Sequence, residues 1–350
     1  MFFRLLIIIC VLLPAALSLA EAAENYLLRF AHSDPGQEAN PHHIMVLEAK
    51  RLIEERTGGR VTVDIFPSKQ LGNDTETVQQ IQGNILEASL VYPQSMVTFV
   101  PEIQVLGIPY MFNVPGVDPD VLMLKIMNGS LMDRLDEALT AKFDNVQLVS
   151  AYGNHWRDLA TTFPLQTIDD MKGRKIRTIP APIQQQFLIN LDAEPTIVNS
   201  SEVFTALGTG LIEGAKYGVL HLYAIRVVDF IKHVYVDHHV PIVCYIVANR
   251  GWLQKLPVDL RDIVVTSLKE AAVFGTLNAA KLNRDYSVQF VEEHGGHIVR
   301  PSETELESFR RAADPIKQMY TEKYGDTWLK YTALAVEEAI EIIDKETSHP

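Results

Sequence analysis

Cysteine is scarce in this sequence, which has two cysteines among 350 residues. Cys10 lies in an apolar N-terminal run, so Cys244 is the only cysteine in the rest of the chain. A single thiol cannot form an intramolecular disulfide. Because Cys244 lies in the apolar, strand-like run VPIVCYIVANR, we expect a buried, unreactive thiol rather than a nucleophile.

Positive charge is also in deficit, since 31 Lys and Arg stand against 44 Asp and Glu, for a formal net charge of −13. An acidic chain is repelled by nucleic acids and by anionic membrane surfaces, so we expect neither as a partner. After the N-terminal run there is no second stretch of about 18 apolar residues, so we expect no stable membrane insertion of the mature chain. Its length allows a large core and favours two lobes over one.

Motifs that mark common enzyme sites are missing. There is no glycine-rich phosphate loop, no dinucleotide-binding glycine fingerprint, no G-x-S-x-G elbow and no H-E-x-x-H zinc motif. Histidines cluster at positions 32, 42 and 43 and at 238 and 239, but neighbouring residues on a strand point to opposite faces and do not converge on a metal. We therefore expect no metal, no cofactor and no enzymatic activity, although a triad assembled in space would leave no motif.

The N-terminus has the pattern of a secretory signal peptide. Arg4 precedes the apolar run Leu5–Leu17, and small residues follow up to Ala20 and Ala22. The run is too short to cross a membrane comfortably, which disfavours the alternative of a retained anchor. We predict that residues 1–22 are a signal peptide, cleaved after Ala20 or Ala22, and that the mature protein is periplasmic.

The first part of the remaining chain alternates between strand and helix patterns. Strands are predicted at 25–33, 60–67 and 86–92, and helices at 40–59 and 71–84. Asn40 caps the first helix with Pro41 at its first position, and Asn73 with Glu76 forms a capping box for the second. Strands separated by helices predict a parallel sheet.

Similar patterns continue to the C-terminus. Helices are predicted at 117–142, 181–191, 200–210, 257–295, 302–324 and 327–345, and strands or extended segments at 145–153, 173–178, 194–198 and 213–219. The helix at 257–295 is far longer than the ~10–14 residues usual in globular proteins, so we expect it to span both lobes.

The stretch MKGRKIRTIPAP, residues 171–182, holds four basic side chains in an acidic protein. It is either a solvated basic turn or a segment that presents one arginine to an anion. Strand alternation puts Lys175 and Arg177 on one face and Arg174 on the other. We interpret Lys172, Arg174 and Lys175 as solvated, which leaves Arg177 as the candidate anion ligand.

Six segments resemble, in order, the solute-binding subunits of tripartite ATP-independent periplasmic (TRAP) transporters. They are LRFAHS, RLIEERTGGRVTVDIFPSKQLGND, VPEIQVLGIPYMF, DMKGRKIRT, EVFTALGTGLIEGAKYG and LPVDLRDIVVTSLKEAA. The resemblance covers essentially the whole mature chain.

The resemblance implies a two-lobed α/β periplasmic binding-protein fold, with mixed sheets, helices on both faces and a ligand cleft between the lobes. We expect 23–150 to form mainly lobe I, 151–250 mainly lobe II with strands crossing between the lobes, and 251–350 to form the spanning and C-terminal helices. It also implies a small organic acid as ligand and TRAP membrane subunits as partners.

In the family, the arginine of the K-[IL]-R strand binds the ligand carboxylate through two parallel N–H donors, and here that residue is Arg177. The alternative for Arg177 is a surface salt bridge. The family also implies a secondary carboxylate contact for Arg157, which otherwise forms a structural ion pair. Trp156 beside it is either core packing or a wall of the cleft.

Two positions depart from the family pattern. Tyr217 replaces a ligand-binding asparagine, and Ser200 replaces an aromatic residue. A tyrosine offers a ring and one hydroxyl in place of an amide's donor and acceptor. We therefore expect the far end of the ligand to be recognised differently from the family's commonest cases.

Further ligand contacts are implied at strand ends in lobe I, where α/β clefts gather ligand-binding residues. They are His32, Ser33, Asp74 and Tyr92. For each, the alternative is a loop or capping role, and Asp74 in particular could simply cap its helix.

Our main hypothesis is a periplasmic receptor that captures a small organic acid around Arg177 without chemistry. A C4-dicarboxylate, a sugar acid, a keto acid and a small aromatic acid all remain open as ligands. Two alternatives come from other classes: a ligand-sensing module for a membrane kinase or chemoreceptor, and an exported hydrolase. The hydrolase would need a nucleophile and a base that converge in space.

Overall fold

The structure is a computed structural model, and it describes residues 24–37, 40–199 and 202–348. The predicted signal peptide and Ser200 lie outside the described residues. The strands are β1 (Tyr26–His32), β2 (Val61–Phe66), β3 (Ala88–Val91), β4 (Val146–Thr161), β5 (Lys175–Thr178), β6 (Glu194–Ile197), β7 (Gly214–Lys216), β8 (His233–Asn249) and β9 (His297–Val299).

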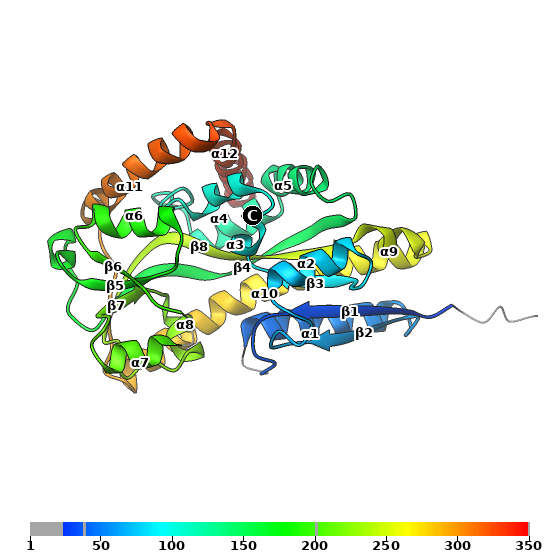
Figure 1. Ribbon diagram of the computed structural model, residues 1–350, viewed down its shortest axis with the longest axis horizontal. Coiled ribbons are helices and arrows are strands. Elements are labelled where there is room, and N and C mark those ends of the chain that lie inside the picture. The colour runs from blue at the N-terminus through cyan, green and yellow to red at the C-terminus, as the bar shows by residue number, and fades with distance from the viewer. Residues whose placement is uncertain (1–23, 38–39, 200–201, 349–350) are drawn as a thin grey trace, which may run out of the picture.

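Helices cover both faces of these strands (Figure 1). They are α1 (Pro41–Arg56), α2 (Asp74–Gln82), α3 (Pro93–Met96), η1 (Pro101–Gly107), α4 (Pro119–Met127), α5 (Ser130–Thr140), η2 (Ile168–Met171), α6 (Pro182–Asn190), α7 (Val203–Gly208), α8 (Val219–Ala224), α9 (Arg250–Lys255), α10 (Val258–Glu292), α11 (Glu303–Tyr324) and α12 (Thr327–Ser348). No helix of the described residues has the length and apolar character needed to cross a membrane.

The strands form one mixed sheet in the order β2-β1-β3-β8-β4-β7-β5-β6, with β9 paired to β8. The pairs β1–β2, β1–β3, β5–β6 and β5–β7 are parallel, as predicted for the first part of the chain. The long strands β4 and β8 are antiparallel to each other and run through both halves (Figure 1). The fold is therefore a mixed α/β fold with crossing strands, and the predicted residue boundaries of the lobes remain a prediction.

Local signals account for the helix starts. The Asn40 side chain accepts hydrogen bonds from the backbone N–H groups of His42 and His43, at 2.9 and 3.3 Å. Asn73 and Glu76 form the predicted capping box. The predicted helix at 117–142 is instead two helices, α4 and α5, which are separated at Asn128 and Gly129.

The helix α10 joins two parts of the molecule, one around β1, β2 and β3 and the other around β7 and α8. Its 35 residues pack on α1 and β4 in one half and on α8 and β9 in the other. The helix approaches α1 and β4 closely at Gly275, where an added Cβ would lie 2.7 Å from Met45 and 2.9 Å from Tyr152. Next to it, the Thr276 hydroxyl accepts a hydrogen bond from the Gly153 backbone N–H at 3.1 Å. The predicted spanning helix is thus anchored at the middle of β4.

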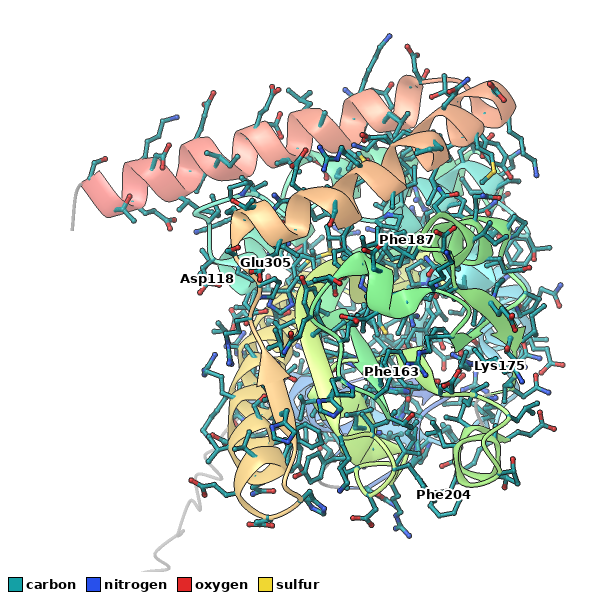
Figure 2. The ribbon with its side chains drawn as sticks, turned by 90° about the vertical axis from the view of Figure 1, so that its left-hand side faces the viewer. Asp118, Phe163, Lys175, Phe187, Phe204 and Glu305 are labelled. Atoms are coloured by element: carbon teal, nitrogen blue, oxygen red, sulfur yellow. The ribbon has the colours of Figure 1, made fainter. Side chains whose placement is uncertain are left out.

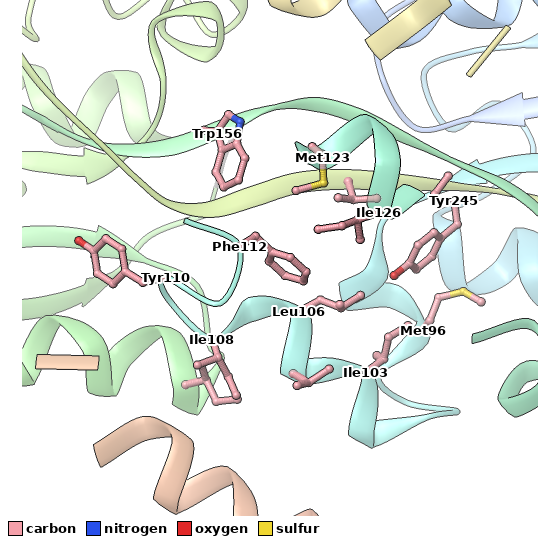
Figure 3. Packing of buried hydrophobic residues seen from close by; sticks show 14 of the residues in the cluster. Met96, Ile103, Leu106, Ile108, Tyr110, Phe112, Met123, Ile126, Trp156 and Tyr245 are labelled. Atoms are coloured by element: carbon pink, nitrogen blue, oxygen red, sulfur yellow. The ribbon is translucent and has the colours of Figure 1, made fainter. Parts of the chain in front are cut away.

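Three hydrophobic clusters form the core. The largest lies between the β4/β8 pair and the helices α4, α5, α6, α11 and α12 (Figure 3). A second joins α1 and α10 to β1 and β3, and a third joins α7 and α8 to β7. Each fully buried large side chain contributes roughly 1.5–3 kcal/mol. The two smaller clusters anchor the elements that carry the candidate site.

Candidate functional site

Arg177 lies in β5, between β6 and β7 and one residue before the end of the strand. Only 5% of it is exposed. Its Nε donates a hydrogen bond to the backbone oxygen of Val198 at 3.0 Å, and its guanidinium carbon lies 5.5 Å from the centre of the Tyr217 ring. Arg177 is therefore held at the inner end of the strand by neutral groups on two neighbouring segments.

The other three cations of the basic stretch have different surroundings. Lys172 and Lys175 are exposed, and Lys175 lies toward the edge of the molecule (Figure 2). Arg174 forms a salt bridge with Glu213 at 2.8 Å and lies over the Phe163 ring. One of the four basic side chains is therefore buried, and it is the one that the sequence singled out.

Two of the three register shifts in β4, each a β-bulge or a similar irregularity, lie in the middle of the strand and set the orientation of its side chains. The register against β8 shifts between Gly153 and His155 and again between Arg157 and Leu159. His155 and Arg157 lie on the face toward α8, and the Nη1 of Arg157 donates to the Lys216 backbone oxygen at 3.4 Å. Bulges of this kind re-aim side chains and recur next to functional sites.

Trp156 points to the opposite face of β4. Its indole packs in the largest cluster, toward Phe112 (Figure 3), and its Nε1 donates to Asp120 at 3.2 Å. Because consecutive strand residues alternate between faces, Trp156 and Arg157 lie on opposite faces of the strand. Trp156 therefore packs in the core, and it also lines a cavity together with His155, so its predicted role as a wall of the cleft stays a prediction.

Lys216 is the partner of Leu159 in the β4–β7 strand pair, and Tyr217 is the next residue after it. Both side chains are buried. The Lys216 Nζ donates to the backbone oxygen and the Oε1 of Gln184, at 2.9 and 2.6 Å. Burial, reinforced by Arg157 and Arg177, lowers the pKa of Lys216 well below its ordinary value. Burial raises the pKa of the Tyr217 hydroxyl, and the two arginines oppose that shift. Three basic side chains thus share one poorly hydrated region.

Two histidines that the sequence reading left out of the site complete this side. His221, in α8, lies 4.4 Å from the Tyr217 ring and stacks on His155 at 5.7 Å, measured between ring centres. Burial, together with Arg157, lowers the pKa of His221 to about 3. The available signal was position, since His221 lies four residues after Tyr217, in the helix that starts there, and His155 lies two strand residues before Arg157.

On the opposite side, Asp74 connects two of the predicted lobe I residues. Its carboxylate accepts hydrogen bonds from the Ser33 hydroxyl and, at 2.9 Å, from the Tyr92 backbone N–H. The Tyr92 hydroxyl donates to Asp34 at 3.2 Å and meets the Nε2 of His42 at 3.1 Å. Ser33, Asp74 and Tyr92 are therefore brought together, and Asp74 does more than begin its helix.

His42 links this group to the middle of the sheet. Its Nε2 lies 2.8 Å from the Nδ2 of Asn154, and its Nδ1 lies 3.6 Å from the Cys244 sulfur. The Tyr152 hydroxyl donates to the Asn154 carbonyl at 2.9 Å. Burial raises the pKa of the Cys244 thiol, in agreement with the expected unreactive cysteine. His42 and Asn154 were not predicted as site residues. The position of His42 depends on the start of α1, and that of Asn154 depends on the register shift between Gly153 and His155.

His32 ends β1 and is buried beside His43, with their ring nitrogens 3.0 Å apart. Burial lowers the pKa of His32 to about 4. The next residue in the chain, Ser33, donates a hydrogen bond to Asp74, so His32 lies close to the residues around Asp74. Among the described residues, no group of three or more His, Cys, Asp or Glu side chains is arranged to hold a metal ion.

We call Ser33, Asp34, His42, Asp74 and Tyr92 the acidic half of the site. His155, Arg157, Arg177, Lys216, Tyr217 and His221 form the cationic half. Charges from both halves act on His221, since Arg157 lowers its pKa while Asp34 raises it. Both halves therefore lie within electrostatic range of His221.

A family model of bacterial extracellular solute-binding proteins, family 7, matches residues 30–323. The chain belongs to this family. The resemblance read from the six sequence segments is thereby confirmed, and family 7 proteins bind solutes and are not enzymes.

The C4-dicarboxylate-binding periplasmic protein of Rhodobacter capsulatus is 25% identical over 287 residues, which cover 81% of this chain and 82% of the relative. The 2,3-diketo-L-gulonate-binding periplasmic protein of Escherichia coli K12 is 24% identical over 245 residues, 70% and 72% of the two chains. A TRAP periplasmic solute-binding protein of Rhodobacter sphaeroides, solved in an open apo form, superimposes with a TM-score of 0.79 and 25% identity over 90% of this chain and 100% of that one. The two-lobed TRAP receptor fold is confirmed, and these relatives are periplasmic.

Proposed function

We propose that this family 7 receptor captures a small organic acid between the acidic and cationic halves, with the ligand carboxylate bound by Arg177 and Arg157. The observation that supports this most is the grouping of Arg157, Arg177 and Lys216 in a poorly hydrated region. Like charges placed together away from water repel strongly, and an anion between them removes that cost.

The guanidinium groups suit a carboxylate in particular. Arg177 stays charged when buried and offers parallel N–H donors at the spacing of carboxylate oxygens. A lysine there would supply only a point charge, and Lys216 is already turned away toward Gln184. We assign the carboxylate contact to Arg177 and a supporting contact to Arg157.

The acidic half contacts the remainder of the ligand. Asp34, Asp74 and Tyr92 present oxygen atoms, which accept hydrogen bonds from hydroxyl groups and repel a second carboxylate. Relatives named for a C4-dicarboxylate and for a sugar acid both occur. We favour an acid with one carboxylate and several hydroxyl groups, with Tyr217 as the ring against which its carbon chain lies.

The two lobes close on the ligand and present it to TRAP membrane subunits for ion-gradient-driven uptake. We place their boundaries as the sequence predicts, with residues 23–150 mainly in lobe I and 151–250 mainly in lobe II. The long elements β4, β8 and α10 run through both, so closure bends a shared frame rather than a flexible linker. Uptake of labelled acid by cells with TRAP membrane subunits, with and without this protein, tests the delivery step.

Binding is tested by thermal-shift screening of purified mature protein against succinate, D-glucuronate, pyruvate and benzoate. A ligand that binds only the folded state raises the melting temperature by mass action. We expect at least one acid to do so. Arg177→Ala should weaken its binding about 30- to 1000-fold, because the carboxylate loses a buried charged partner.

Arg174→Ala is the matched control, since it removes the same charge three residues away at the surface. We expect its affinity to stay within about threefold of wild type, as is usual for exposed ion pairs. A screen without any shift contradicts the proposed function. Equal affinity in Arg177→Ala and wild type contradicts the carboxylate assignment.

A further inference from the structure

The stacked histidines of the cationic half have no role in the proposed carboxylate contact. Their rings lie 5.7 Å apart with planes inclined by 22°. Gly218 allows this approach of α8 to β4, because a Cβ there would lie 2.6 Å from the Trp156 backbone oxygen. His221 also contacts Tyr217, so the pair extends from the ring beside Arg177 into the protein.

The inner member of the pair is short of hydrogen bonds. Both ring nitrogens of His155 are buried, and neither has a hydrogen-bond partner among the described residues. A buried polar atom left without a hydrogen bond destabilises the folded protein. The outer member, His221, lies against the Tyr217 ring, which also lies beside the Arg177 guanidinium, so an anion held by Arg177 would be close to it. His221 is therefore the member of the pair nearer to the proposed ligand, and His155 is the buried member behind it.

The charges around the pair oppose its protonation in the free protein. Arg157 and Arg177 of the cationic half lower the pKa of His221, and so does His42 of the acidic half. Asp34 of the acidic half acts in the opposite direction and raises it. His155 also lines a cavity with charged or titratable side chains from the α4 start, β4, β8, α10 and the β9 segment, namely Asp118, Asp120, Asp158, His238, Arg284, Glu292, His297 and Arg300. Burial and the neighbouring His221 lower the pKa of His155 well below its ordinary value.

A bound anion changes this balance. A negative charge between Arg157 and Arg177 offsets the two positive charges that disfavour an imidazolium ion beside them. A group that becomes easier to protonate when ligand binds must take up protons on binding, and by reciprocity lower pH must strengthen binding.

We propose that His221 donates a hydrogen bond to the bound anion, and that a proton from solvent enters the His155–His221 pair as the anion binds. The imidazole becomes imidazolium, and the ligand stays ionised. The proton resides on His221, and His155 acts as a positioning residue whose ring stacks on that of His221. The inference rests on the proposed function, because it requires an anion at Arg177.

The first experiment measures binding by calorimetry at about pH 7.5, 6.5 and 5.5, with the acid from the panel that gives the largest thermal shift. The affinity should rise about 3- to 30-fold across this range, below the limit of tenfold per pH unit for one linked proton. Runs near pH 6 in MES and in bis-Tris, which differ in ionisation enthalpy, should show proton uptake on binding.

Variants then assign the proton. His221→Asn and His155→Asn keep a polar side chain but cannot titrate, so each should flatten the pH dependence. The control is His294→Asn, because His294 lies outside the cavity that His155 lines and its Nδ1 lies 3.1 Å from an oxygen of Asp229. It should retain the wild-type pH dependence. If a site variant fails to fold, imidazole NMR of the wild type with and without the acid reports the same proton.

The outcomes separate the two proposals. Binding that is lost in Arg177→Ala but independent of pH in wild type overturns the proton uptake and leaves the proposed function in place. A pH dependence that persists in both His155→Asn and His221→Asn also overturns it. Unchanged affinity in Arg177→Ala, or no binding by any acid in the panel, overturns both.

Discussion

The two halves of the site differ in how completely their polar groups are satisfied. In the acidic half, Asp74 accepts from two donors, and Tyr92 meets both Asp34 and His42. In the cationic half, basic side chains share a poorly hydrated region, and the nitrogens of His155 have no hydrogen-bond partner in the described chain. The acidic half is built to hold its own shape, while the cationic half is arranged for a group that comes from outside.

This difference has an energetic consequence. Removing a member of a satisfied network leaves its partners unpaired, which destabilises the folded state. Removing one of several like charges in a low-dielectric region relieves repulsion. We therefore expect substitutions in the acidic half to lower stability and substitutions in the cationic half to lower affinity instead.

The largest effect on stability is expected for Asp74→Ala. The change leaves the buried Tyr92 N–H and the Ser33 hydroxyl without their shared acceptor, at a cost of about 2–3 kcal/mol. Urea unfolding of the free protein measures it, with Asp64→Ala at an exposed position of β2 as control. A loss as small as the control's would show that the acidic half is not a cooperative network.

A second prediction concerns acid sensitivity. The pKa of His32 is lowered to about 4 and that of His221 to about 3, so in the folded protein both stay neutral where unfolded histidines, near 6.5, take up protons. Stability is therefore fully present above about pH 6.5 and falls as the pH drops toward 4. The loss at about pH 5 should be roughly 2 kcal/mol for buried His32.

Urea midpoints at about pH 7 and pH 5 test this, for wild type, His32→Gln and the exposed control His297→Gln. The midpoint of His32→Gln should fall less between the two pH values than that of wild type, whereas the control should match wild type. Parallel losses in all three proteins would mean that His32 is protonated in the folded state.

The smallest effect on stability is expected for Arg157→Met, in the cationic half. Methionine keeps much of the side-chain volume but removes a charge that faces Arg177 and Lys216. The melting temperature of the free protein should stay constant or rise, by the equivalent of less than about 1 kcal/mol, while ligand affinity falls about tenfold. A marked drop in melting temperature would remove the contrast between the two halves.

Much of the fold follows from local sequence signals. Asn40 and the pair Asn73 and Glu76 cap their helices as predicted, because capping depends on residues only a few positions apart. The long helix follows from uninterrupted helical spacing. The prediction failed at Asn128 and Gly129, where one helix becomes two, because it overlooked Asn-Gly as a local signal that ends one helix and starts the next.

The sequence by itself determined the family, the element order and the importance of Arg177, because these depend on residue types at fixed spacings. Only the tertiary structure decided that Trp156 lies in the core, that Lys216 turns toward Gln184, and that His42, His155 and His221 join the site. Those outcomes depend on β4 bulges and on contacts between segments far apart in the chain. Desolvation and the summed field of neighbouring charges exist only once these segments are packed together.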